Sequence, residues 1–108
     1  MHTLARTALA AALAALSGAA LAQQPAASAL KNNLSMCAGC HGIPGYKTAY
    51  PEVYHVPKLG GQSPAYLVNA LKAYRSGERN HPSMRGIAAG LSDKDMEELA
   101  AYYGGGGK

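Results

Sequence analysis

The chain lacks most of the large side chains that usually fill a protein core. Its 108 residues contain no tryptophan and no phenylalanine, and its seven tyrosines are its only aromatic residues apart from four histidines. With two cysteines, at most one disulfide can stabilise the fold. A domain this small and this poor in apolar bulk needs another source of stability, and a bound apolar group would supply it.

Long apolar runs are also missing, except close to the N-terminus. Residues 7–16 are almost purely Ala and Leu, they follow a single basic residue, Arg6, and they precede the small-x-small pattern of residues 20–22. This arrangement is typical of a secretory signal peptide, so we predict cleavage after Ala22 and a periplasmic protein. The run is too short, too rich in Ala and too interrupted for an uncleaved anchor. We therefore expect no membrane span in the mature chain.

No stretch of the sequence concentrates charge of one sign. The formal charge is +4, and loss of residues 1–22 leaves nine basic and six acidic side chains, or +3. The Lys and Arg residues are dispersed, which is unlike a surface that tracks a phosphate backbone, so we expect no nucleic-acid partner. A diffuse positive face could steer docking to an acidic protein, although a merely solvated exterior is the more ordinary interpretation.

The distribution of Gly and Pro predicts an all-α fold with long loops. Apolar residues suggest a first short helix over 29–35 that ends at the cysteines, and residues 42–62 are too rich in Gly and Pro for a helix or a strand. Ser63, Pro64 and Gly77 bound a second helix. Ser92 opens a last one that stops at Gly104. We expect one domain over residues 23–103, a disordered tail over 104–108, no strands, and a break at residues 80–82 that leaves Met84 off any helix.

The decisive motif is CAGCH at positions 37–41, the pattern of covalent haem attachment. Cys37 and Cys40 are three residues apart, so on a helical turn their sulfurs project from one side and can form thioethers with two vinyl groups of one porphyrin. His41 follows at once and can bring its imidazole to the iron. The predicted export agrees, because bacteria attach c-type haem outside the cytoplasm.

Three other interpretations of the cysteine pair were weighed. A thioredoxin-like dithiol needs a βαβ unit, and no strand is predicted. A structural zinc site needs four ligands, for which His55 or His81 could join the motif. A plain disulfide is possible in an oxidising compartment. None of these explains why His follows the second cysteine or what fills the core.

From about residue 29 to residue 103 the chain resembles the small bacterial class I cytochromes c. The resemblance rests on four segments in order: CAGCHG at 37–42, PKLGGQ at 57–62 leading into Tyr66-Leu67, PSM at 82–84, and LSD at 91–93 opening a helix that ends LAAYY at 99–103. It implies a cytochrome c fold of about four short helices around one covalent haem c. The segment from 42 to 56 is longer and richer in Tyr than in the simplest members, and Leu30 and Leu34 stand where these cytochromes commonly place a Gly and an aromatic residue in the first helix.

The resemblance also implies a ligand set. His41 would be the proximal iron ligand, Met84 the sixth, and the Pro57 carbonyl would accept a hydrogen bond from the proximal imidazole. A thioether is a soft ligand that raises the reduction potential and closes the sixth position to substrates. Tyr46, Tyr50 and Tyr54 are four apart and could line the haem or replace the missing Phe and Trp.

The other methionines and histidines are less suitable than Met84 as the sixth iron ligand. Met1 is lost with the signal peptide, Met36 is expected on the wrong side beside Cys37, and Met96 belongs to the apolar stripe of the last helix. His81 is the serious rival because it shares the segment of Met84, but we expect it, like His55, at the surface.

Three functions compete at this point. The first is a periplasmic carrier of single electrons, without catalysis of its own, that docks with a redox donor and an acceptor as a monomer. The second is a haem subunit of a larger dehydrogenase or reductase. The third is a peroxidase or gas-binding haem protein with an open sixth position, against which the Met at position 84 argues.

Overall fold

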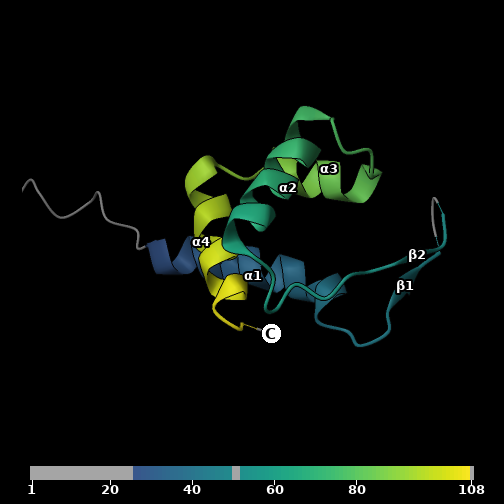
Figure 1. Cartoon of the computed structure of the whole chain (residues 1–108), viewed down its shortest axis with the longest axis horizontal. Coiled ribbons are helices and arrows are strands. Elements are labelled where there is room, and N and C mark those ends of the chain that lie inside the picture. Colours follow the sequence, from purple (N-terminus) through teal and green to yellow (C-terminus); the bar gives the residue numbers. More distant parts are fainter. Residues whose placement is uncertain (1–25, 50–51, 108) are drawn as a thin grey trace, which may run out of the picture.

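A computed structural model describes residues 26–49 and 52–107, so the predicted signal peptide, Tyr50 and Lys108 lie outside the described residues. The all-α fold class is confirmed: four helices account for most of this part of the chain, with one short hairpin (Figure 1). The elements are α1 (Ala26–His41), β1 (Lys47–Thr48), β2 (Tyr54–His55), α2 (Pro64–Ser76), α3 (Pro82–Ala89) and α4 (Asp93–Gly104).

Helix α1 is longer than predicted. The sequence suggested an end at the cysteines, but the helix continues through CAGCH to His41, and the Gly42 amide closes it by donating to the Ala38 carbonyl at 3.0 Å. Gly39 has a helix-compatible backbone and does not break it. Both cysteines and the histidine therefore project from one continuous helix.

Helices α2 and α4 begin where the capping residues predict. The Ser63 hydroxyl accepts from the Tyr66 amide, Pro64 occupies the first turn, and Gly77 ends α2 with φ +89°, the left-handed conformation that glycine adopts without strain. At α4 the Ser92 and Asp95 side chains each accept from the other residue's backbone amide, which makes a complete capping box.

Helix α3 corrects the prediction that Met84 lies off any helix. Pro82 does not break the chain here but occupies the first turn of α3, where a proline has no amide to lose. His81 is the N-cap, and its Nδ1 accepts from the Met84 amide at 3.4 Å. Because His is an uncommon capping residue, this helix start has no clear signal in the sequence.

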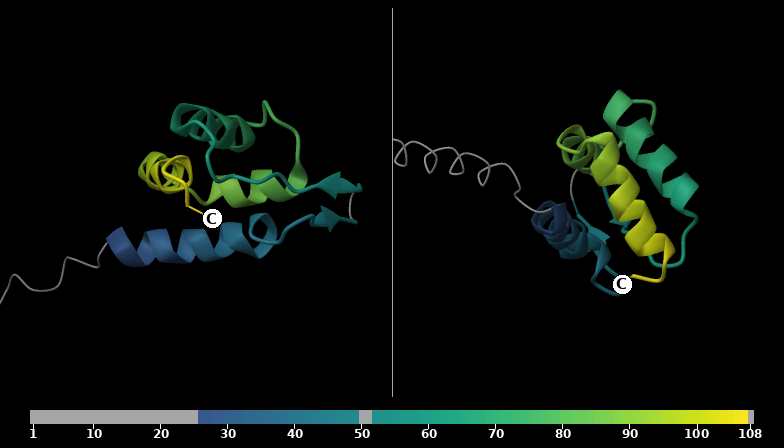
Figure 2. Two further views of the ribbon diagram at one scale, coloured as in Figure 1. Left: turned by 60° about the horizontal axis from the view of Figure 1, so that its bottom comes forward. Right: turned by 90° about the vertical axis from the view of Figure 1, so that its left-hand side faces the viewer.

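The core lies where α2, α3 and α4 meet, and α1 packs against α4 from the other side (Figures 1 and 2). Its buried side chains are Leu67, Ala88, Leu91, Met96, Leu99, Ala100 and Tyr103. Leu30 and Leu34 of α1 are half-buried against this cluster, and Asn33 donates to Asp95 at 3.2 Å. The first and last helices are thus joined through two leucines and a hydrogen bond.

A hairpin that the sequence did not predict projects from the long segment 42–62. Lys47 pairs with His55 and Thr48 with Tyr54 in antiparallel register. Each strand has two residues, too few for an alternating pattern to be visible among the surrounding Gly and Pro. The hairpin lies beyond the C-terminal end of α1 (Figure 2).

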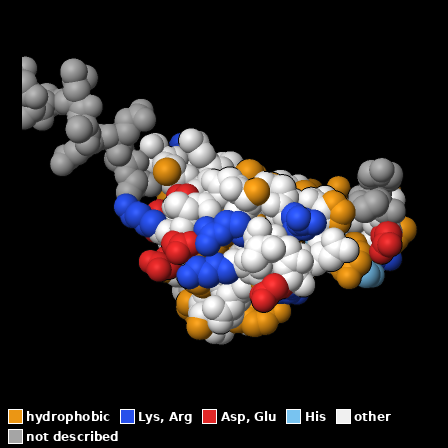
Figure 3. All heavy atoms as spheres, turned by 90° about the horizontal axis from the view of Figure 1, so that it is seen from above, with side chains coloured by type: hydrophobic (Ala, Val, Ile, Leu, Met, Phe, Trp, Pro, Cys, Tyr) orange, Lys and Arg blue, Asp and Glu red, His pale blue; other side chains and the backbone are white. Residues whose placement is uncertain are grey.

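The outer surface mixes charges of both signs. Arg75 of α2 contacts the Asp93 carboxylate at 2.6 Å, and Lys72 lies 3.8 Å from the same side chain. Arg75 also donates to the Leu91 carbonyl at 3.1 Å, which joins the end of α2 to the start of α4. On the face seen in Figure 3, basic and acidic side chains are interspersed. Within the described residues, no helix has the length and apolar character needed to cross a bilayer.

The C-terminal glycines remain hydrogen-bonded over their described part. Gly104 belongs to the last turn of α4 and lies so close to Pro64 that a Cβ would collide with the proline ring. The amides of Gly105, Gly106 and Gly107 donate to carbonyls of residues 101–103. This differs from the disordered tail expected over 104–108.

Candidate functional site

A cavity of about 690 Å³ lies between the C-terminal half of α1 and helices α2 and α3. All four helices, the segment 54–62 and the loop before α3 contribute to its walls, which are mostly apolar. The volume falls within the range of cofactor sites, roughly 300 to 1,000 Å³. The residues predicted for the site from the sequence, Cys37, Cys40, His41, Pro57 and Met84, all line it.

One face of α1 carries the attachment motif. Four side chains of this face line the cavity: Met36, Cys37, Cys40 and His41. Cys37 and Cys40 are three residues apart and Cys37 and His41 four, spacings that place side chains on the same side of a helix. Cys37 is half-buried and Cys40 is exposed, and the two do not form a disulfide with each other. Burial raises the pKa of the Cys37 thiol, so this side chain is neutral at pH 7.

His41 is oriented by the backbone of the long loop. Its Nδ1 lies 2.6 Å from the Pro57 carbonyl oxygen. A carbonyl can only accept, so Nδ1 carries the hydrogen and donates. In the neutral ring this leaves the Nε2 lone pair free to bind a metal, and the hydrogen bond both fixes the ring and increases its basicity.

Met84 enters the cavity from a different helix. It is half-buried in the first turn of α3, and the N-terminal end of α3 lies across from the C-terminal end of α1 (Figure 2, left). The cavity therefore receives an imidazole from one side and a thioether from the other. This is the arrangement that two axial ligands of a planar group need.

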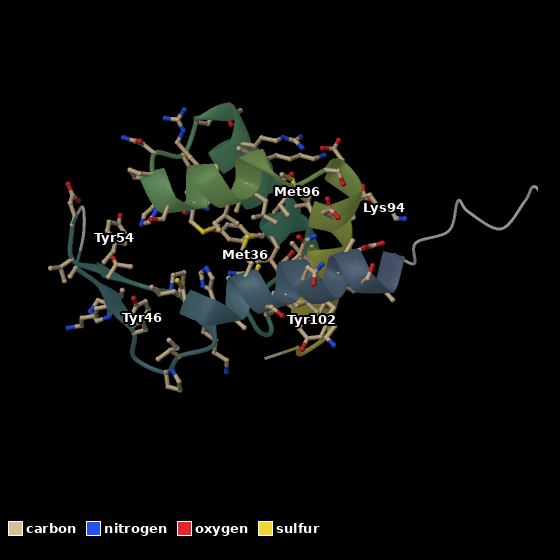
Figure 4. The ribbon with its side chains drawn as sticks, turned by 180° about the vertical axis from the view of Figure 1, so that it is seen from behind. Met36, Tyr46, Tyr54, Lys94, Met96 and Tyr102 are labelled. Atoms are coloured by element: carbon tan, nitrogen blue, oxygen red, sulfur yellow. The ribbon has the colours of Figure 1, made fainter. Side chains whose placement is uncertain are left out.

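The rival residues are distributed differently from the sequence-based expectations. Met96 is fully buried in the core and lies outside the cavity wall, as predicted. Met36, expected on the wrong side, does line the cavity and extends from α1 toward the interior in Figure 4. It shares its helix with His41, whereas Met84 comes from the opposite wall.

Two further histidines of the described residues also reach the cavity wall. His81 is half-buried, because its ring caps α3 and contacts Tyr54, so it is not the surface residue that was expected. His55 is exposed at the cavity edge. Of the three tyrosines proposed to line the site, Tyr54 does and Tyr46 does not.

Several cavity residues were missed from the sequence. Arg79 lies with its guanidinium carbon 4.7 Å from the centre of the Tyr74 ring, and it donates to the Tyr66 hydroxyl at 3.4 Å. Tyr66 and Tyr74 share the inner stripe of α2, a spacing that could have placed them together. Tyr103 of α4 is buried, and removal from water raises its pKa to about 12, with smaller contributions from Cys37 and Tyr102.

The donors and charges of this cavity fit a haem. Two thiols and an imidazole on one wall match two thioether bonds and a proximal ligand, and the thioether on the other wall matches a sixth ligand. Lys58 and Arg79 line the cavity, whereas none of its lining side chains is Asp or Glu, which suits a group with two carboxylates. In the described part of the chain, no three His, Cys, Asp or Glu side chains come close enough to hold a metal ion, so the zinc alternative has no ligand set there.

Comparison with known proteins gives the same result. The family model for cytochrome c matches residues 15–103. Cytochrome c-554(548) of Halomonas halodenitrificans is 42% identical over 80 residues, which are 71% of this chain and 92% of the relative. The cytochrome subunit of sulfide dehydrogenase of Chlorobaculum tepidum is 32% identical over 68 residues, 63% of this chain and 57% of that one.

A solved structure is also similar. The reduced recombinant cytochrome c4 from Pseudomonas stutzeri superposes with a TM-score of 0.51 at 34% identity, covering 73% of this chain and 49% of that chain. This chain thus spans about half the length of the last two proteins. It belongs to the cytochrome c family. Its fold is the cytochrome c fold, its cofactor is a covalent haem c, and its function is electron transport.

Proposed function

We propose that the chain is a periplasmic carrier of single electrons whose haem is bound by Cys37 and Cys40 and ligated by His41 and Met84. The observation that supports this proposal is that the His41 imidazole, held by the Pro57 carbonyl, and the Met84 side chain line the same cavity from different helices. When bound, the haem supplies a reversible one-electron ferric/ferrous couple.

The proposed ligand set suits transfer rather than catalysis. His41 and Met84 would together hold the iron of the bound haem and leave no ligand position for a substrate, which is why we assign no enzymatic activity to the chain. The soft thioether favours ferrous iron and so raises the potential. The apolar wall excludes water and limits the reorganisation that a change of charge would otherwise require.

The cavity edge supports brief encounters with redox partners. Met36, Tyr54 and Tyr66 all line the cavity, so they would lie beside the bound haem. An apolar rim there would let donor and acceptor proteins dock in turn over a small area, as transient redox complexes do. The dispersed positive charge would add steering without holding a partner.

The second candidate is a haem subunit of a larger enzyme. It is favoured by the similarity to a cytochrome subunit of sulfide dehydrogenase. The two functions differ in what accompanies the protein during native purification from its own periplasm. A free carrier elutes alone at the size of one chain, whereas a subunit elutes with its partner.

Absorption spectra of Met84→Ala test the ligand assignment. The oxidised wild type should show the weak charge-transfer band of Met sulfur on ferric iron, and Met84→Ala should lose it, lower the potential and bind carbon monoxide when reduced. Met36→Leu is the matched control because it removes the other thioether of the cavity, and it should keep the band. A band that survives in Met84→Ala and disappears in Met36→Leu would move the sixth ligand to α1.

A further inference from the structure

We propose that His81, braced by Tyr54, is the positioning residue that holds Met84 at the iron. The inference rests on the proposed function, which assigns Met84 as the sixth ligand. It concerns how firmly that ligand is held, and so how easily another molecule can take its place.

The first contact is between His81 and the ligand's own backbone. The first amides of a helix have no partner within it. In α3 the His81 Nδ1 accepts from the Met84 amide at 3.4 Å, and the first turn contains no acidic side chain that could substitute. The hydrogen bond therefore fixes the backbone from which the thioether extends.

The second contact holds His81 itself. The Tyr54 ring meets the His81 ring edge to face, with the centroids 5.3 Å apart and the planes at 89°. Tyr54 is fixed in turn by the hairpin, where it pairs with Thr48, whose hydroxyl donates toward the Tyr54 carbonyl at 3.4 Å. Figure 4 shows Tyr54 on the hairpin side of the cavity.

These contacts explain an unusual residue choice. Ser, Thr, Asp and Asn are the favoured N-caps, because a short side chain reaches the amides easily. A short cap could not present a ring to Tyr54. The His81 imidazole does both, with an acceptor nitrogen for the Met84 amide and a ring that packs edge to face with Tyr54. The hairpin, 27 residues before His81, is thereby linked to the segment that carries Met84.

Displacement of Met84 by added imidazole in the ferric holoprotein measures the effect. Loss of a cap shifts the equilibrium of a helix turn by about fivefold, and loss of an aromatic pair by about two- to tenfold.

His81→Ala loses both contacts, and we expect its imidazole affinity to rise at least fivefold. His81→Asn keeps a capping oxygen and Tyr54→Leu keeps the cap, so each should show a smaller rise. Tyr54→Phe keeps the ring contact and should match the wild type.

Ser92→Ala is the control for general destabilisation. It removes a cap of the same kind from α4, away from Met84, so it should lower the melting temperature without changing the imidazole affinity. A merely structural role for His81 would give the same pattern as Ser92→Ala. The charge-transfer band should remain in His81→Ala before imidazole is added.

The outcomes separate this inference from the assignment beneath it. If the affinities of His81→Ala and Tyr54→Leu stay within twofold of the wild type while Met84→Ala binds imidazole far more tightly, the positioning role is wrong and the ligand assignment stands. If the wild type shows no charge-transfer band and His81→Ala changes to a high-spin spectrum, His81 is itself the ligand and both proposals fail.

Discussion

At position 41 a single hydrogen bond determines which ring nitrogen is available. Nδ1 donates to a backbone carbonyl, so in the neutral ring Nε2 is the nitrogen with a free lone pair, and His41 lines the cavity. Because the acceptor is a main-chain oxygen, the orientation of His41 depends on the path of the loop through Pro57 and not on the chemistry of the side chain there.

Tyr103 should make the stability of the protein fall at high pH. Its pKa in the folded state is raised to about 12, above the value of about 10 in the unfolded chain. Between these values the unfolded state releases the proton while the folded state keeps it, so stability decreases as the pH rises from about 10 to about 12. The loss should be at most about 3 kcal/mol. Urea unfolding of the holoprotein at pH 8, 10 and 11.5 measures it.

Tyr103→Phe is the control for other groups that titrate in the same range. It removes the hydroxyl and keeps the ring, so the pH dependence attributable to Tyr103 should disappear. If the wild type and the variant lose equal stability between pH 10 and 11.5, the phenol does not have the raised pKa.

Individual residues were predictable where a motif fixes their chemistry. The spacing of Cys37, Cys40 and His41 specifies the attachment chemistry without a structure, and the structure places all three on one face of α1. Met36 and His81 were misplaced for a different reason. Whether a side chain lines a cavity depends on where its helix begins and ends and on how that helix is oriented. The length of α1, which places Met36, and the start of α3, which places His81, were not evident from the sequence.

Helix α4 offers a test at the level of the element. Ser92→Ala should lower the free energy of unfolding by about 1 kcal/mol at pH 7, because it removes the cap. The bonds from Ser92 are the main reason that the pKa of Asp95 lies below its usual value. A carboxylate with a lowered pKa contributes stability above its unfolded value, about 3.9, and loses that contribution as the pH falls through the folded value.

The difference between the wild type and Ser92→Ala should therefore shrink in acid. Urea unfolding at pH 7 and at pH 3 measures it. Ser35→Ala is the matched control, since that exposed hydroxyl only donates to the Lys31 carbonyl within α1. A difference that is constant with pH would show that Asp95 does not take part in the cap.

Elements were predictable where strong terminal signals mark them. Ser63, Gly77 and Ser92 each satisfy a helix end by a common mechanism, so α2 and α4 were located correctly. The end of α1, the start of α3 and the hairpin have weaker signals: a glycine inside a helix, an imidazole as a cap, and strands of two residues. In all three, contacts formed only in the folded molecule override local preference.

For the whole molecule, the cavity implies that the haem is part of the core. Its volume is about 690 Å³ and its walls are mostly apolar. In the absence of haem these walls would face water, and this loss of apolar burial is large for a domain that is stable by only about 5 to 15 kcal/mol. The haem-free chain should not keep this fold.

Cys37→Ala/Cys40→Ala, produced without haem, tests this expectation. Its circular dichroism should lack most of the helical signal, and it should unfold without a cooperative transition. The holoprotein should melt cooperatively under the same conditions. A haem-free variant with a native-like helical signal and a sharp transition would mean that the cavity collapses and the four helices support themselves.

The residues proposed to attach the haem and those proposed to set its reduction potential occupy different parts of the chain. Cys37 and Cys40 lie three residues apart on α1, near the beginning of the predicted mature protein. The Pro57 carbonyl and Met84 follow much later in the sequence. A chain exported N-terminus first, as the predicted signal peptide implies, would present CAGCH before Pro57 and Met84 follow. Attachment of the haem through α1 would then not depend on the residues that orient His41 and supply the sixth ligand.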